Sequence, residues 1–387
     1  MDHLDGLPLT SSPTPGPTPE LVIDLDRVAA AYRGLTGALP GVAVHYAMKC
    51  NPHPEILALL QALGCRFEIA SAAELDALTA IGHDPAQVLS SNPVKPLAHI
   101  VRQHAAGVWR FAVDCEDELD KLAVAAPGAA VVVRLAAHQI RSGVPSEGKF
   151  GVDVDTAVTL MLAARERGLR PYGAAFHVGS QMLLPHAWRA PLRAVGTVMY
   201  KLAAEDVFLQ MVNLGGGFPA KYAGKTPPPA EYGAAIAAGL AGLPYPVAAV
   251  CEPGRALVAE AGRLRATVIG TAVRGGRRWA HLDVGAFNGL MESLETGNQL
   301  RFPVSDSRGS ARRERFCLTG PTCDSQDTIM FDAELSADLR TGDEVYLGST
   351  GAYTTVYASR FNGFDVPRVR CVTGVAIETS DDAAYCG

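Results

Sequence analysis

The sequence predicts an eight-stranded parallel βα barrel followed by a mainly β domain. From about residue 42 to residue 253, short β-branched or apolar runs alternate with amphipathic helical segments. Eight such units are the number that a (β/α)8, TIM-type barrel requires. Beyond about Ala261 the helical periodicity fades, and short strand-like runs separated by Gly, Asp and Pro turns follow. This change predicts a second domain built mainly from strands.

The expected barrel strands are short and occur at regular intervals. They lie at residues 42–48, 65–70, 87–91, 109–114, 129–136, 172–178, 209–215 and 247–253. Before them, residues 21–25 are expected to form a strand that could pair with either domain. A helix is expected to follow, with Asp26 as its N-cap. Strands of the second domain are expected within residues 263–274, 278–284, 315–320, 343–348 and 369–375.

These elements divide the chain into a leader (1–20), a barrel (21–261) and a β domain (262–387). Each proline of the leader removes an amide donor and fixes φ, so we expect a flexible segment. The leader lacks the basic and apolar regions of a secretory signal. No segment approaches the roughly 18 uncharged apolar residues of a membrane-spanning helix. We therefore expect a cytoplasmic protein.

Composition excludes several classes of partner. The net charge is −6, from 34 basic and 40 acidic residues, so no electrostatic field favours nucleic acid or an anionic membrane. A cationic substrate fits this charge better. The eight cysteines include no CxxC pair, which favours free thiols over disulfides and gives no support for a metal site.

Polar side chains follow the expected barrel strands where each strand ends. In chain order these are Lys49, Glu68, Ser91 with Asn92, Asp114, Arg134, His177, Gly215–Gly217, and Glu252 with Arg255. The carboxyl ends of barrel strands meet at one face, which is where barrel enzymes place reactive groups. The pattern therefore predicts one site at that face.

Lys49 is the candidate nucleophile of this site. It follows an apolar strand directly, so partial desolvation is expected to lower its pKa and allow it to condense with a carbonyl. Taken alone, it also fits a solvated lysine at a strand end.

The three glycines 215–217 can close backbone N–H groups on an anion such as phosphate, or form a mobile turn. Arg255 could bind the same anion, or a surface carboxylate. His177 and Ser180 are further candidates, and His177 also fits a structural histidine.

The expected β domain contributes a second group of candidates. Cys323 stands beside Asp324, and a single cysteine is more often a buried apolar side chain than a reactive thiol. Tyr353 could donate a hydrogen bond from its phenol O–H to a phosphate, and Phe361 could form an aromatic wall of the site. Each of these also fits ordinary packing.

Taken together, these segments resemble the fold-type III pyridoxal-phosphate decarboxylases, which include ornithine, lysine, arginine and diaminopimelate decarboxylases. The resemblance runs from about Val22 to about Phe364, most closely to the bacterial ornithine/lysine type. The segments that carry it, in the family's order, are YAMKCN, FEIAS, HVGSQ, GGGFP, EPGR, GPTCD and GAYT. It implies an alanine-racemase-like barrel plus a β domain, assembled as a homodimer with shared active sites.

The resemblance also implies roles around pyridoxal 5'-phosphate. Lys49 would bind the cofactor aldehyde, His177 would stack on the ring, and Glu252 would keep the pyridine nitrogen protonated. Glu68 and Arg134 would lie close to the cofactor. The residues expected to bind or support the phosphate are Ser180, Gly215, Gly216, Gly217, Gly254, Arg255 and Tyr353.

For the substrate, the resemblance implies contacts from a partner subunit. Cys323 would protonate Cα and Asp324 would bind a distal ammonium, with Phe361 nearby. Glu292 stands one position before the second acidic contact of the eukaryotic ornithine enzymes, and either takes that role or leaves a different pocket. Diaminopimelate decarboxylases pair the cysteine with Glu, so Cys323–Asp324 favours ornithine or lysine as substrate and putrescine or cadaverine as product.

Other functions remain compatible with the sequence. A decarboxylase of arginine, diaminopimelate or a secondary-metabolite intermediate is one alternative, and a non-catalytic homologue that binds a regulator is another. A racemase of the same fold is disfavoured, because those enzymes place an arginine at the pyridine nitrogen where Glu252 stands here.

Overall fold

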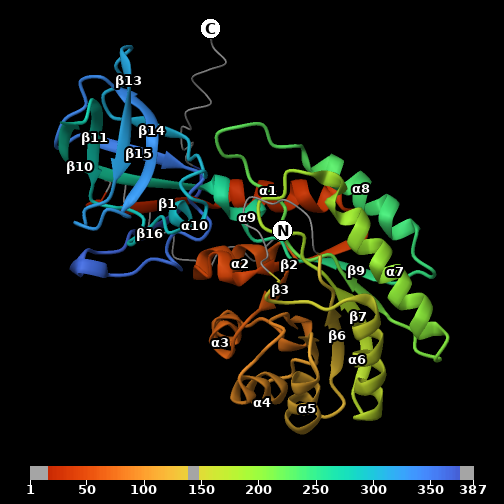
Figure 1. Cartoon of the computed structure of the whole chain (residues 1–387). Coiled ribbons are helices and arrows are strands. Elements are labelled where there is room, and N and C mark those ends of the chain that lie inside the picture. Colours follow the sequence, from red (N-terminus) through yellow and green to blue (C-terminus); the bar gives the residue numbers. More distant parts are fainter. Residues whose placement is uncertain (1–15, 138–147, 375–387) are drawn as a thin grey trace.

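The computed structural model describes residues 16–137 and 148–374. In this part of the chain, eight parallel strands form a closed barrel and eight further strands form a separate mixed sheet. Figure 1 shows the two as distinct lobes, with the sheet beside one end of the barrel. The predicted fold class is therefore confirmed.

Every barrel strand overlaps one of the predicted apolar runs. The strands are β2 (Val42–Ala47), β3 (Arg66–Ile69), β4 (Leu89–Ser90), β5 (Arg110–Val113), β6 (Ala130–Arg134), β7 (Arg170–Ala175), β8 (Met211–Asn213) and β9 (Ala248–Cys251). Each pairs in parallel with the next, and β9 pairs with β2 to close the barrel. Closure leaves no edge strand exposed.

Helices surround the barrel and bury the outward-facing side chains of its strands. They are α1 (Leu25–Ala38), α2 (Pro54–Ala62), α3 (Ala72–Ala80), α4 (Leu97–Ala105), α5 (Glu116–Ala125), α6 (Val154–Glu166), α7 (Arg189–Ala203), α8 (Pro229–Ala241) and the short α9 (Arg255–Val258). None of the helices within 16–137 and 148–374 is both long and apolar enough to span a membrane.

Helix α1 begins earlier than the sequence predicts. Its N-cap is Asp24, whose Oδ1 accepts hydrogen bonds from the backbone N–H groups of Asp26 and Arg27 at 2.9 and 3.1 Å. The prediction of Asp26 as the cap is wrong. Asp26 lies in the first turn, where its charge still favours the positive end of the helix dipole.

The β domain is a mixed sheet in the order β12-β15-β10-β11-β13-β14, with β1 and β16 attached through β10. Its elements are β10 (Gly262–Arg274), β11 (Arg277–Leu282), α10 (Glu292–Glu295), β12 (Val304–Asp306), β13 (Arg313–Thr319), β14 (Thr328–Ser336), β15 (Glu344–Gly348) and β16 (Arg368–Val372). Strands β12 and β14 were not predicted from the sequence.

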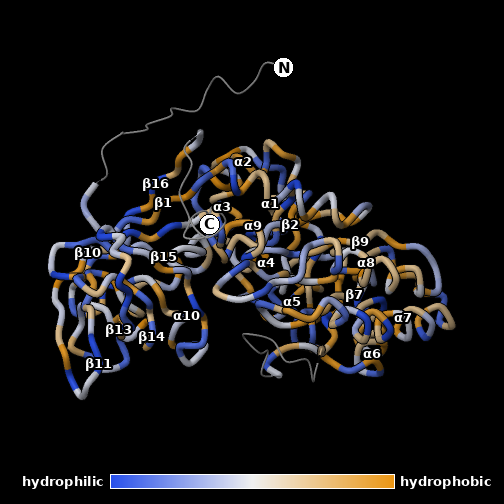
Figure 2. The backbone as a smooth tube through the Cα atoms, turned by 90° about the horizontal axis from the view of Figure 1, so that it is seen from above, coloured by the Kyte–Doolittle hydropathy of each residue, from blue (hydrophilic) through white to orange (hydrophobic). Residues whose placement is uncertain are grey.

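The first strand, β1 (Glu20–Asp24), belongs to this sheet. It pairs antiparallel with β10 and parallel with β16, which decides the alternative that the sequence left open. Buried Glu20 joins the strands further, through ion pairs to Arg265 and Arg370 at 3.6 and 3.2 Å. Seen from above, β1 and β16 lie on the side of the sheet that faces α2 (Figure 2). Most of the predicted leader, residues 1–15, lies outside the described residues.

Candidate active site

Five of the site residues occupy inward-facing positions at the carboxyl ends of barrel strands. A small apolar cluster fills the barrel interior and consists of Leu89, Val132, Ala175, Met211 and Val250. Because side chains alternate along a strand, the inward position after each of these lies two residues further on. Those positions hold Ser91, Arg134, His177, Asn213 and Glu252. Together with Lys49 and Glu68 they line a cavity of about 250 Å³.

Lys49 lies in a short 3-10 turn, Met48–Cys50, directly after β2. Its neighbours Met48 and Cys50 are buried, whereas the Lys49 side chain is exposed to the cavity. The Glu68 carboxylate raises the pKa of Lys49 more than burial lowers it, and Glu252 adds to the rise. The expectation of a lowered pKa is therefore wrong, because it considered burial alone, and the two carboxylates at the same barrel face outweigh burial.

Two hydrogen bonds orient Glu252. Its Oε1 accepts from Asn213 Nδ2 at 2.7 Å and from the Ser91 hydroxyl. Asn213 also accepts, through Oδ1, from the backbone N–H of Gly215 at 2.9 Å. One amide thus joins the carboxylate to the glycine loop. Asn213 was not among the predicted site residues, although a polar amide at the inward end of an apolar strand is a signal that could have identified it.

His177 is held neutral. Burial lowers the pKa of its imidazole to about 3, and the charges of Arg134 and Lys49 act in the same direction. A neutral imidazole suits stacking on an aromatic ring, since it needs no counter-ion.

Arg134 and Glu68 also line this cavity. The Arg134 guanidinium lies 5.4 Å from the centre of the Phe150 ring. Burial raises the pKa of the Glu68 carboxyl, while the Lys49 ammonium lowers it.

A second cavity of about 70 Å³ opens beside the first and shares Lys49, His177 and Glu252 with it. Its other lining residues include Ser180, Gly216, Gly217, Gly254, Arg255 and Tyr353. The glycines are required by close packing. A Cβ on Gly216 would lie 2.6 Å from the Glu252 carbonyl oxygen, and one on Gly217, which has φ +99°, would lie 2.4 Å from that of Gly179. Gly215 has φ +65°, and a Cβ there would lie 2.1 Å from the Phe176 carbonyl oxygen.

Arg255 is a second cation of this cavity, in addition to Lys49. It is buried, and it donates to Tyr222 at 2.6 Å and to Ser180 at 3.4 Å. The Tyr353 ring lies 5.0 Å from its guanidinium. A buried guanidinium beside glycine N–H groups is a chemically suitable phosphate site.

Glu292 has a different environment from the one expected of a substrate contact. It forms a buried bidentate ion pair with Arg255, one of whose hydrogen bonds is 2.9 Å long. Glu292 is not one of the described residues that line the two cavities. Its carboxylate is therefore engaged beside the anion site, which the sequence could not indicate because the two residues lie 37 positions apart.

This arrangement fits pyridoxal phosphate. The larger cavity brings an amine and an oriented carboxylate together, and the smaller one offers space that only glycines leave open, next to a buried cation. Residues 25–259 match the family described as "Pyridoxal-dependent decarboxylase, pyridoxal binding domain". The chain belongs to this family. It is a pyridoxal-phosphate-dependent amino-acid decarboxylase of the ornithine/lysine type.

The decarboxylase resembles several characterised proteins along nearly its whole length. It is 37% identical over 352 residues to the lysine/ornithine decarboxylase of Selenomonas ruminantium, covering 90% of this chain and 88% of that protein. The lysine/ornithine decarboxylase from Vibrio vulnificus, solved with cadaverine, is 31% identical with a TM-score of 0.85, covering 92% of this chain and 94% of that one. SrLDC, solved with PLP and cadaverine, is 35% identical with a TM-score of 0.84, covering 92% and 91%.

The remaining predicted residues of the decarboxylase lie away from these cavities. Cys323 and Asp324 are exposed in the loop between β13 and β14, and Phe361 is 45% exposed. None of the three is among the described residues that line the two cavities. Asn362 Nδ2 approaches Cys323 Sγ at 4.0 Å. The chain by itself therefore does not bring Cys323 and Asp324 to Lys49.

Asp327 holds the Cys323 loop in place. It is fully buried and accepts hydrogen bonds from the backbone N–H groups of Ala286 and Thr322 at 2.7 and 3.0 Å. The loop that carries Cys323 and Asp324 is thus anchored at its base while its tip faces solvent.

Proposed function

We propose that this enzyme decarboxylates ornithine or lysine and releases putrescine or cadaverine. The observation that carries the proposal is Glu252, a carboxylate fixed by two donors in the cavity that Lys49 enters. The relatives named as lysine/ornithine decarboxylases, including one solved with putrescine and with cadaverine, support this substrate class.

In this proposal each residue of the two cavities has a specific task. Lys49 binds the cofactor aldehyde, and His177 packs against the ring. Glu252 holds the proton on the pyridine nitrogen. Bound pyridoxal phosphate supplies the electron sink that accepts the electron pair left by the departing carbon dioxide. Arg255 binds the phosphate, together with Ser180, Gly216, Gly217, Gly254 and Tyr353, and Gly215 supports the loop.

We further propose that two chains form a homodimer with shared active sites. Cys323 and Asp324 are exposed and anchored through Asp327, so a partner could accept them into its Lys49 cavity. The chain also exposes aromatic side chains, since Phe331 is 47% and Tyr357 44% exposed. Exposed large apolar side chains favour a protein interface.

Mixed dimers test the shared site. Neither Lys49→Ala nor Cys323→Ala protein alone is expected to be active, whereas a mixture of the two should regain activity, because hybrid dimers contain one intact site. No regain in mixtures that demonstrably exchange subunits would contradict the proposal.

The substrate is tested by measuring carbon dioxide release from ornithine, lysine, arginine and diaminopimelate, with and without added pyridoxal phosphate. We expect kcat/KM to be highest for ornithine or lysine, because an exposed carboxylate such as Asp324 suits a terminal ammonium. A preference for diaminopimelate would contradict the assignment of Asp324. Absence of both turnover and the visible absorbance of lysine-bound cofactor would favour a non-catalytic homologue.

A further inference from the structure

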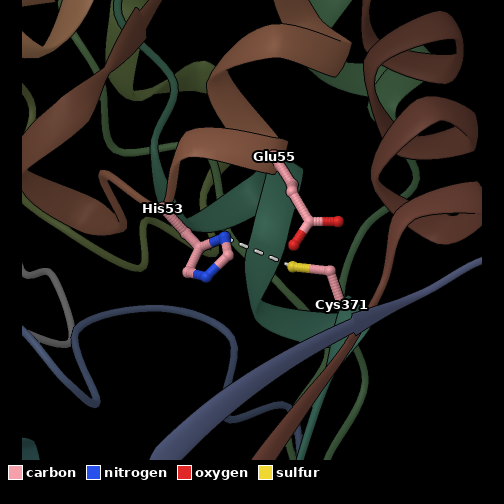
Figure 3. A group of neighbouring side chains, drawn as sticks. All are labelled: His53, Glu55 and Cys371. Atoms are coloured by element: carbon pink, nitrogen blue, oxygen red, sulfur yellow. Dashed lines mark hydrogen bonds between the residues drawn. The ribbon is translucent and has the colours of Figure 1, made fainter. Parts of the chain in front are cut away.

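Three side chains with metal-binding groups converge where the barrel meets the β sheet. His53 precedes α2, Glu55 lies in its first turn, and Cys371 lies on β16. One ligand atom from each lies within 4.8 Å of the other two. Figure 3 shows the imidazole, the carboxylate and the thiol directed toward the same space, with His53 Nδ1 and Cys371 Sγ 3.4 Å apart.

The spacing suits a tetrahedral zinc site. Zinc binds Cys sulfur at about 2.3 Å and His nitrogen at about 2.0–2.1 Å, which places two such ligands about 3.6 Å apart in a tetrahedron. The observed 3.4 Å between Nδ1 and Sγ is close to this value. Glu55 has the longest of the three side chains, so a change of rotamer can bring its carboxylate into the same range. A thiolate and a carboxylate would also balance the charge of a divalent cation.

The backbone around His53 is rigid before any metal binds. Pro52 and Pro54 fix φ on both sides of it. The His53 N–H donates to Asn51 Oδ1 at 3.1 Å, and Asn51 Nδ2 donates to the Gly351 carbonyl at 2.8 Å. The imidazole is therefore presented by a segment already tied to the β domain, which lowers the entropic cost of binding.

The cluster is separate from the catalytic site. Its three members are not among the described residues that line the two cofactor cavities. It joins the first turn of a barrel helix to the strand that pairs with β1, so an ion here would link the two lobes.

We propose that His53, Glu55 and Cys371 bind one Zn²⁺ per chain, with solvent as the fourth ligand, and that the ion stabilises the contact between the barrel and the β sheet. The ligand class is a borderline-soft divalent transition metal, because the donor set combines thiolate, imidazole and carboxylate.

The test uses holoenzyme without an affinity tag, dialysed against a chelator and titrated with Zn²⁺ in competition with a chromophoric chelator. We expect one tight site per chain. Cys371→Ser and His53→Ala should each weaken it more than about 100-fold, since loss of even an outer-shell partner weakens metal sites about 10- to 100-fold. Cys115→Ser and Cys323→Ser should leave it unchanged, because neither residue belongs to the cluster.

Two further measurements distinguish a metal site formed by the three residues from non-specific binding of the ion to a thiol. Co²⁺ should give a thiolate-to-metal charge-transfer band that is lost in Cys371→Ser. The Tm of the parent should rise steeply up to one equivalent of Zn²⁺ and only slowly with further excess, with no rise in the His53→Ala variant. Equal Zn²⁺ affinity in the parent, Cys371→Ser and His53→Ala would overturn the proposal and leave the cluster as a hydrogen-bonded group. Loss of zinc binding would not affect the assignment of Lys49 and Glu252.

Discussion

Replacement of Asn213 by leucine should lower turnover and weaken cofactor binding together. The Asn213 amide makes two bonds, one to the Glu252 carboxylate and one from the Gly215 N–H, at 2.7 and 2.9 Å. Leucine has a similar volume and makes neither. A hydrogen bond to a charged group contributes about 1.5–3 kcal/mol, which corresponds to a decrease in kcat of about 10- to 150-fold if the whole loss falls on turnover.

In its second hydrogen bond, Asn213 accepts from the backbone N–H of Gly215 in the glycine loop. An unpaired buried N–H costs about 1–3 kcal/mol, so the Kd for pyridoxal phosphate should rise about 5- to 150-fold. Ser91→Ala is the matched variant, because the Ser91 hydroxyl also donates to Glu252 Oε1 but has no described bond to the loop. It should lower kcat and leave the cofactor Kd unchanged.

Both variants are assayed for carbon dioxide release at saturating cofactor, and the Kd is measured by titration of the visible absorbance. If Asn213→Leu retained the parent kcat and Kd, the reasoning about Glu252 would be refuted. If Ser91→Ala raised the Kd as much as Asn213→Leu, the assignment of the second bond to the loop would be wrong.

Three further predictions concern other parts of the fold. Gly216→Ala should weaken cofactor binding, because its Cβ would lie 2.6 Å from the Glu252 carbonyl oxygen. Gly34→Ala is the control and should bind cofactor as the parent does, because a Cβ there would have no heavy atom within 4 Å. Equal Kd values for the two variants would contradict this. Burial lowers the pKa of His45 to about 3, so between this value and its ordinary pKa only the unfolded chain takes up the proton. The free energy of unfolding should therefore decrease as the pH is lowered. Calorimetry should show that His45→Leu loses about 2 kcal/mol less than the parent between pH 7.5 and pH 5. An unchanged pH dependence would exclude His45 as the cause. Asp327→Ala should release the Cys323 loop and lower activity while Lys49-bound cofactor absorbance persists; loss of that absorbance would place Asp327 in a different role.

Most of the barrel could be predicted from the sequence because its signal is local. Each strand is a short apolar run, and a polar residue follows it at the inward position, as Val250 and Glu252 illustrate. Of the two unpredicted strands, β12 lacks that signal. β12 has three residues, Val304–Asp306, and buries the polar side chain of Asp306 through bonds to Ser336.

The predictions that failed depend on tertiary contacts. The pKa of Lys49 is set by Glu68 and Glu252, which reach it from other strands. The ion pair between Glu292 and Arg255 was not predicted either way, because it joins two domains and sequence order carries no information about that pair. The cap of α1 differs because the φ and ψ of Asp24 already belong to the preceding strand.

The proposed chemistry requires that Lys49, rather than another lysine, binds the cofactor. Lys149 lines the same cavity and Lys95 is buried close by, so both are real alternatives. The holoenzyme is reduced with borohydride, digested, and its pyridoxyl-bearing peptide is sequenced by mass spectrometry. We expect the adduct on Lys49 and no adduct in Lys49→Ala protein, whereas an adduct on Lys149 or Lys95 in the parent would show that a different lysine binds the cofactor.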